Sequence, residues 1–181
     1  IYSHFLVVCP VSLLENWKRE ISKFYPSFTT YLHYGARRTG DYRELLKYDI
    51  TIMSYSSAIA DAGMLTMTNW DLLVIDEAQN IKNPRAKRTK AIKQINRDVP
   101  IAITGTPFEN HMTDIWSIVD FVMPGFLGNL NQFEMFFEDD LDSAVRLEKL
   151  ITPLILRRRV KDVAKDLPER VDIPQPIIMT D

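Results

Sequence analysis

Five short segments between residues 5 and 103 have the character of β-strands. They are Phe5–Cys9, Thr29–Tyr34, Asp49–Met53, Leu72–Ile75 and Val99–Ile103. Most of them are apolar at consecutive positions, which is typical of strands buried on both faces of a parallel sheet. Helix-like segments separate them. The pattern predicts an α/β fold with a mostly parallel sheet flanked by helices.

The segment after the first strand has the pattern of an amphipathic helix. Ser12-Leu13-Leu14-Glu15 fits a capping box, with Ser12 at the N-cap and Glu15 three positions later. Apolar residues then recur at helical spacing, and Pro26 ends the pattern. The N–H groups at the start of such a helix suit a phosphate, but every ordinary strand-to-helix turn presents them too.

Beyond Met112 the strand pattern is replaced by helical patterns. Helices are expected over Thr113–Met123, near Asn131–Glu138 and over Leu141–Ile155, with no strand between them. This region is predicted to be a helical appendage on the α/β core.

Composition and charge narrow the classes of function. The 22 Lys and Arg residues against 24 Asp and Glu give a net charge of −2, so any nucleic-acid site must rest on local patches. The single cysteine, Cys9, excludes a disulfide within the chain. This fits a reducing, intracellular compartment, the cytoplasm or nucleoid of a bacterium or the nucleus of a eukaryote. No apolar run approaches membrane-spanning length.

Two adjacent carboxylates follow the strand Leu72–Ile75. In parallel sheets the carboxyl edge of the strands is where ligands bind. There Asp76 suits a Mg²⁺ ion, held directly or through water, and Glu77 suits orienting or deprotonating an attacking water. The alternative is that Asp76 caps the next helix and Glu77 is merely solvated.

Hydroxyl groups follow two other strands. Thr104 and Thr106 flank Gly105, which we expect to allow a tight turn beside the carboxylates. Their hydroxyls suit sensing a phosphate or satisfying the turn backbone. Ser54 and Tyr55 similarly suit a nucleic-acid phosphate or a helix cap.

A run of seven cations without an acid lies between Ile81 and Arg97. Such a run is typical of a solvated helix face, and a nucleic-acid stripe is the alternative. The cations are Lys82, Arg85, Lys87, Arg88, Lys90, Lys93 and Arg97.

Taken in order, these segments resemble the motifs of the Swi/Snf family of DNA-translocating ATPases, in helicase superfamily two. The matching segments are Cys9–Trp17 (motif Ia), Thr51–Tyr55 (motif Ib), Asp76–Asn83 with its DEAQ box (motif II), Thr104–Asn110 (motif III) and Leu156–Pro168 (the exit from the first lobe). The resemblance implies a RecA-like lobe at 1–111, the family's helical protrusion and return at 112–156, and a basic linker toward a second lobe at 157–181.

The resemblance also implies roles for individual residues. Asp76 would hold Mg²⁺ through water, Glu77 would polarise the attacking water, and Gln79 would face the γ-phosphate of ATP. Thr104, Gly105 and Thr106 would couple the nucleotide state to DNA. The residues in the segments that family members set against the DNA backbone are Ser12, Ser54, Tyr55, Lys82 and Asn83. The implied partners are double-stranded DNA, bound without sequence preference, a DNA-bound protein and the second lobe.

Two parts of the family pattern are missing. No glycine is followed by Lys and then Ser or Thr, so there is no phosphate loop, and no second lobe with arginine fingers follows. We therefore expect an interior fragment, inactive alone, of an ATP hydrolase that translocates on duplex DNA. Loss of the strand before the phosphate loop should leave an unpaired sheet edge. The alternatives are a non-enzymatic DNA- or protein-binding module and a strand-separating helicase.

Overall fold

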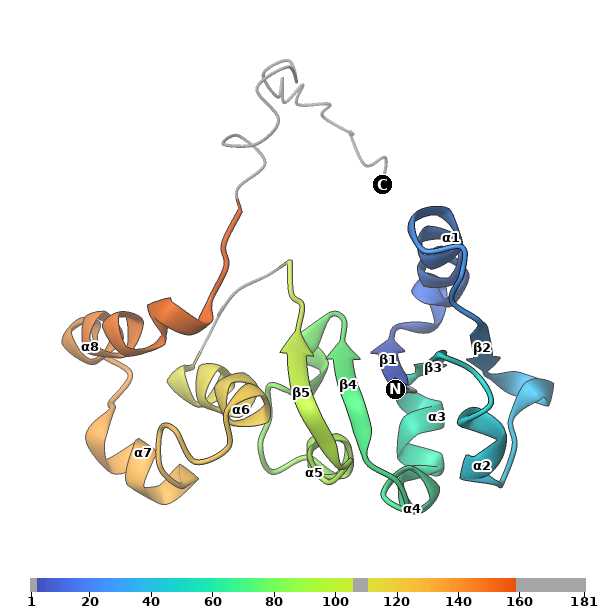
Figure 1. Cartoon of the computed structure of the whole chain (residues 1–181). Coiled ribbons are helices and arrows are strands. Elements are labelled where there is room, and N and C mark those ends of the chain that lie inside the picture. Colours follow the sequence, from blue (N-terminus) through green and yellow to red (C-terminus); the bar gives the residue numbers. More distant parts are fainter. Residues whose placement is uncertain (1–2, 106–110, 159–181) are drawn as a thin grey trace, which may run out of the picture.

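The computed structural model describes residues 3–105 and 111–158. Its five strands form one sheet in the order β2-β3-β1-β4-β5, and every neighbouring pair is parallel (Figure 1). The strands are β1 (Phe5–Cys9), β2 (Thr30–His33), β3 (Ile50–Ser54), β4 (Trp70–Ile75) and β5 (Arg97–Ala102). The predicted parallel α/β sheet is confirmed, with each strand within two residues of its expected bounds.

Helices connect the strands and continue beyond them. They are α1 (Leu14–Phe24), α2 (Tyr42–Leu45), α3 (Tyr55–Ala60), α4 (Ala62–Leu65), α5 (Lys87–Lys93), α6 (Met112–Val122), α7 (Leu130–Phe136) and α8 (Leu141–Ile151), with the 3₁₀ turns η1 (Val11–Leu13), η2 (Gly35–Arg37), η3 (Ala78–Ile81) and η4 (Thr152–Leu154). None of the helices in the described ranges is long and apolar enough to cross a membrane.

The two faces of the sheet are covered by different helices. Alternate residues of a strand point to opposite faces, so Val7 packs with α1 whereas Val8 packs on the other side. On the α1 face, Leu14 and Ile21 contact the sheet. On the other face, helices α3 to α6 close a second core that includes Phe121.

Helix α6 lies beside β5, and α7 and α8 lie beyond it on the side away from the sheet (Figure 1), in the region expected to form a helical protrusion. They share a small core of their own, built from Trp116, Phe133, Leu147 and Ile151 together with neighbouring apolar residues. Helix α6 belongs to both cores, because its Phe121 packs under the sheet while Trp116 faces the protrusion. It therefore joins the protrusion to the lobe.

One edge of the sheet carries exposed apolar side chains. Strand β5 pairs only with β4 within the described residues. On the α1 face, Val99, Ile101 and Ile103 are 52%, 42% and 41% exposed. Within the described ranges, β5 is thus a sheet edge with exposed apolar side chains on one face.

Two helix starts differ from the expected ones. The capping-box prediction is wrong: Ser12 lies in η1, α1 begins at Leu14, and neither helix start has a side-chain cap. Backbone bonds replace it, since Leu13 N donates to Pro10 O at 2.9 Å. The helix expected to have Pro84 in its first turn begins later, at Lys87. Here Asn83 forms a turn whose side chain accepts from Arg85 N at 2.9 Å.

Candidate functional site

The residues predicted to act together follow β1, β4 and β5 at one edge of the sheet. Asp76 N donates to Val8 O, Ile103 N to Ile75 O, and Ala78 N to Ile103 O, each at 2.8 Å. These bonds continue the strand pairing one step past the strand ends. They bring the chain around Asp76 and Glu77 beside the chain that leads to Thr104, as expected for parallel neighbours.

The Asp76 carboxylate has a donor on each oxygen. Its Oδ2 accepts from the indole Nε1 of Trp17 at 2.9 Å, and its Oδ1 accepts from Glu77 N at 2.8 Å. The hydroxyl of Tyr55 donates to the Asp76 backbone carbonyl at 2.8 Å. In the sequence, Trp17 is one of the regularly spaced apolar residues of its helix and the last residue of the motif Ia segment. No local pattern predicts its contact with a residue 59 positions away.

Glu77 has a left-handed backbone, with φ 52° and ψ 56°, and no other non-glycine in the described ranges has positive φ. This conformation costs about 1–2 kcal/mol for a residue with a Cβ. Asn80 offsets part of the cost, because its backbone N and its Nδ2 both donate to Glu77 O at 2.9 Å. Strain of this kind concentrates at functional sites, and here it turns the chain sharply after β4.

A chain of hydrogen bonds connects the end of β5 to Glu77. Thr104 Oγ1 donates to Gln79 Oε1 at 2.9 Å, and Gln79 Nε2 donates to Glu77 Oε2 at 2.7 Å. Thr106 lies outside the described residues. Gly105 is exposed, without positive φ, and has open space where a Cβ would stand. The bend at Gly105 therefore does not use the positive φ that favours glycine, and its part in coupling stays a prediction.

The donor set at this edge fits a magnesium ion held through water. Mg²⁺ prefers oxygen ligands, keeps several waters, and is often held by one or two carboxylates together with substrate phosphates. Asp76 supplies such a carboxylate. Within residues 3–105 and 111–158, no three His, Cys, Asp or Glu side chains gather into a full ligand cage, so the site does not resemble a dedicated protein cage.

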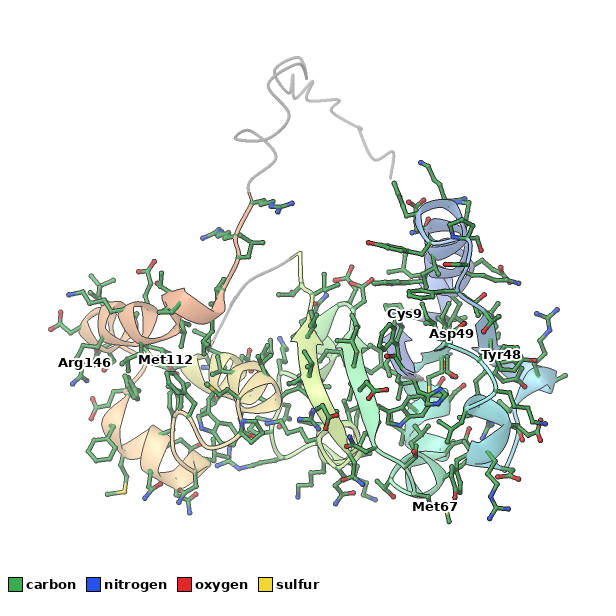
Figure 2. All side chains as sticks on the ribbon, in the orientation of Figure 1. Cys9, Tyr48, Asp49, Met67, Met112 and Arg146 are labelled. Atoms are coloured by element: carbon green, nitrogen blue, oxygen red, sulfur yellow. The ribbon has the colours of Figure 1, made fainter. Side chains whose placement is uncertain are left out.

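Two buried side chains near Asp76, Cys9 and Tyr55, are affected by its negative charge. Burial, with a smaller contribution from the Asp76 charge, raises the pKa of Cys9 from 9.0 to about 12. The same two causes, in the same order, raise the pKa of Tyr55. Cys9 lies at the end of β1 (Figure 2). Near neutral pH neither side chain is an anion, so neither competes with Asp76 for a bound cation.

The predicted DNA-contacting residues after β1 and β3 lie in different environments. Ser12 is exposed in η1. Ser54 is 1% exposed and caps α3, since its Oγ accepts from Ser57 N at 3.1 Å. Tyr55 is also buried. The structure thus gives Ser54 and Tyr55 internal partners, and the exposed hydroxyl next to them belongs to Ser56. Their contact with DNA stays a prediction.

Most of the basic run holds the protrusion against the lobe. Three cations pair with acids of α6 and α7: Lys82 with Asp114 at 3.7 Å, Arg85 with Glu134 at 2.9 Å, and Lys93 with Asp120 at 2.7 Å. Arg97 donates to the backbone carbonyls of Lys93, Ile95 and Phe121. Lys93 and Arg97 thus belong to an internal interface, whereas the ion pairs of Lys82 and Arg85 lie at the surface. Lys87 and Lys90 are exposed and make no ion pair with a described residue.

Comparisons with known proteins agree with this geometry. The family described as "SNF2-related domain" matches residues 1–180. The chain is 39% identical over 178 residues to the putative ATP-dependent helicase/translocase YwqA of Bacillus subtilis (strain 168), covering 92% of this chain and 19% of the relative. It is 31% identical over 197 residues to the chromatin-remodeling ATPase INO80 of Candida glabrata, covering 96% and 13%.

Two solved structures share the fold. The Sulfolobus solfataricus SWI2/SNF2 ATPase core in complex with dsDNA superimposes with a TM-score of 0.81 at 39% identity, covering 92% of this chain and 36% of that one. The Sulfolobus solfataricus SWI2/SNF2 ATPase core domain gives a TM-score of 0.78, also at 39% identity, covering 92% of this chain and 35% of that one. The chain thus spans a fifth or less of the curated relatives above and about a third of the solved cores.

Proposed function

The chain belongs to the SNF2-related family, and on that basis we propose that it is the first RecA-like lobe of an ATP-dependent translocase on double-stranded DNA. The observation that supports this best is the hydrogen-bonded set of Asp76, Glu77, Gln79 and Thr104 at one edge of the sheet. Phosphoryl transfer to water uses a carboxylate that helps to hold Mg²⁺ and a residue that positions the attacking water. The bond from Gln79 to Thr104 connects these two carboxylates to the next strand.

Each residue has a distinct part in this proposal. Asp76 would hold Mg²⁺ through water, and the ion would supply positive charge that neutralises the nucleotide phosphates. Glu77 orients the attacking water, and Gln79, which donates to Glu77, faces the γ-phosphate. Thr104, with Gly105 and Thr106 after it, relays the nucleotide state toward DNA.

Duplex DNA would be bound through its phosphates. Ser12 and Asn83 are exposed, and Lys82 is partly exposed beside its ion pair with Asp114. Contacts of this kind carry no base information, so binding would be independent of sequence and weakened by salt. The solved relative that contains dsDNA supports this choice of partner.

We propose that residues 1–181 do not hydrolyse ATP by themselves. The sequence contains no Gly-Lys-Ser/Thr loop to cradle the phosphates. An arginine finger from a second lobe is worth ~10³–10⁵ in rate. The longer parent protein would supply the phosphate loop and the arginine finger. It would act inside the cell, and its substrate would be a protein bound to DNA.

The test uses the parent protein with Glu77→Gln and Asp76→Asn, and exposed Glu138→Gln as the control. Loss of a positioned base predicts a fall in DNA-stimulated hydrolysis of ~10²–10⁴-fold for Glu77→Gln with ATP affinity nearly unchanged. Asp76→Asn should weaken nucleotide binding as well. If the acids only cap a helix, each change costs about 1 kcal/mol of stability or less and turnover survives. A near-normal kcat in Glu77→Gln would overturn the proposal.

A second assay separates the translocase from a strand-separating helicase. The parent should displace a third strand from a DNA triplex in an ATP-dependent reaction, because that needs movement along an intact duplex. It should not separate the two strands of a duplex with a single-stranded tail. Strand separation without triplex displacement would favour the helicase.

A further inference from the structure

We propose that Trp17 is a positioning residue for the nucleotide site: its indole N–H holds the Asp76 carboxylate in the orientation that receives Mg²⁺ and ties that carboxylate to helix α1. The inference rests on the proposed function, because it assigns the metal to Asp76. It starts from the 2.9 Å hydrogen bond between Trp17 Nε1 and Asp76 Oδ2.

Trp17 is held firmly enough to act in this way. It sits on α1 between Leu14 and Ile21, both of which are buried against the sheet. Its ring packs against the same core as Val7 and Val74. With the helix anchored on both sides, the indole has little freedom to turn away from Asp76.

The bond differs from those of the other two indoles. Trp70 Nε1 donates to Leu65 O at 3.2 Å, and Trp116 Nε1 donates to Gly128 O at 3.1 Å. Those bonds satisfy a buried N–H with a backbone carbonyl. Trp17 instead donates to a carboxylate, where hydrogen bonds are stronger because the acceptor is charged.

The consequence for Asp76 follows from its two oxygens. Glu77 N occupies one side of Oδ1 and Trp17 occupies one side of Oδ2, so rotation of the carboxylate would break a bond in either direction. Each oxygen keeps lone-pair capacity for a metal-bound water. Outer donors that orient a metal-binding carboxylate typically change metal affinity by 10–100-fold.

The same bond links two parts of the lobe. Helix α1 begins directly after η1, which carries the exposed Ser12. A displacement of that helix start would be carried by α1 to Trp17 and from there to Asp76. The structure thus provides a direct route between the proposed DNA-facing loop and the proposed metal-holding carboxylate.

The test measures Mg²⁺ binding without hydrolysis in the parent protein. Trp17→Phe keeps an aromatic ring and removes the N–H donor together with the pyrrole part of the indole, a loss of volume that the Trp116→Phe control shares. A fluorescent, non-hydrolysable ATP analogue is titrated at increasing Mg²⁺, and the half-maximal Mg²⁺ concentration is read. We expect Trp17→Phe to raise that concentration about 10–100-fold, while Trp116→Phe, which loses an equivalent indole donor in the protrusion, leaves it unchanged.

Two further variants make the outcomes distinct. In an Asp76→Asn background, Trp17→Phe should add little further loss, because the two residues act as one unit. If Asp76→Asn raises the Mg²⁺ requirement and Trp17→Phe does not, the positioning role is wrong and the proposed function stands. If neither variant changes it, Asp76 does not hold the metal and both fail. Should Trp17→Phe not fold, Trp17→Tyr also lacks the indole N–H and carries the same expectation.

Discussion

The side chains of Gln79 and Glu77 are joined by a hydrogen bond of 2.7 Å, donated by Gln79 Nε2 to Glu77 Oε2. On its other side the same amide accepts from Thr104 Oγ1 at 2.9 Å. Gln79 is therefore the link between the end of β5 and the proposed water-orienting carboxylate. A residue whose amide donates and accepts at once suits relaying a change from one strand end to the other.

Gln79→Leu should break this link without emptying its space. In the parent protein we expect the stimulation of hydrolysis by DNA to fall by about tenfold or more, since a hydrogen bond to a charged group is worth about 1.5–3 kcal/mol. The measurement is the ratio of turnover with and without duplex DNA. Asn80→Ala, which alters the neighbouring turn but not the link, is the comparison. An unchanged ratio in Gln79→Leu would contradict the relay.

The left-handed backbone of Glu77 predicts that glycine at this position gives a more stable protein than alanine does. Glu77→Gly and Glu77→Ala both remove the carboxylate, but only glycine takes φ 52° without strain. After allowing for the greater freedom of glycine in the unfolded chain, the Gly variant should be more stable than the Ala variant by about 0.5–1 kcal/mol. Urea unfolding of the pair measures this difference. An Ala variant as stable as the Gly variant would show that the turn is not strained.

The ion pair between Lys93 and Asp120 should matter more than the pair between Arg85 and Glu134. The side chains of the first pair are 17% and 22% exposed, against 66% and 35% for the second. Burial lowers the pKa of Lys93, and Asp120 opposes that effect. Asp120→Asn should therefore cost about 1–3 kcal/mol, and Glu134→Gln about 0–1 kcal/mol.

Thermal or urea unfolding of the two variants tests this ranking. Asp120→Asn keeps an oxygen for Gly125 N, which donates to Asp120 Oδ1 at 3.2 Å, so the loss can be assigned to the charge. Equal costs for the two variants would mean that the basic run does not hold the protrusion in the way the structure indicates.

The raised pKa of Cys9 predicts that the free energy of unfolding falls at alkaline pH. Its folded pKa of about 12 lies above its ordinary value of 9.0. Between these values the unfolded thiol has lost its proton and the folded thiol has kept it, so the contribution present below about pH 9 declines as pH rises toward about 12. The slope from this group cannot exceed the ~1.4 kcal/mol per pH unit of one proton.

The check is urea unfolding under reducing conditions at about pH 8 and about pH 10. Cys9→Ala should show a smaller decline between the two than the unaltered protein. Tyr55, whose pKa burial also raises, contributes in the same direction at higher pH and is present in both proteins. Identical declines would show that the thiol ionises equally in both states. Native Cys9, which is fully buried, should also resist alkylation.

DNA binding by the loop after β1 is tested with a matched pair of serines. Ser12 lies in η1, whereas Ser22 is exposed near the other end of α1. Ser12→Asp should weaken binding of the parent to duplex DNA by about tenfold or more through repulsion of phosphate, and Ser22→Asp should not. Fluorescence anisotropy at two salt concentrations measures both. Equal losses would place the DNA surface elsewhere.

The sequence by itself determined the kind of fold and the position of the chemistry. Strands such as Phe5–Cys9 are apolar along their length, which is typical of a buried parallel sheet. Asp76 follows the strand that ends at Ile75, and Thr104 follows the strand that ends at Ile103. Parallel strands align their carboxyl ends, so the sequence already places these residues at one edge of the sheet. The helical protrusion followed from helical spacing of apolar residues after Met112.

The tertiary structure alone decided which partners these residues have. The bond from Trp17 to Asp76 and the pairs of the basic run with α6 and α7 join segments far apart in the chain. Local propensity carries no information on such pairs, because they depend on how helices pack against the sheet. The predicted capping role of Ser12 was wrong because the chain forms the 3₁₀ turn η1 before α1. Backbone hydrogen bonds of η1 stand where the side-chain cap was expected.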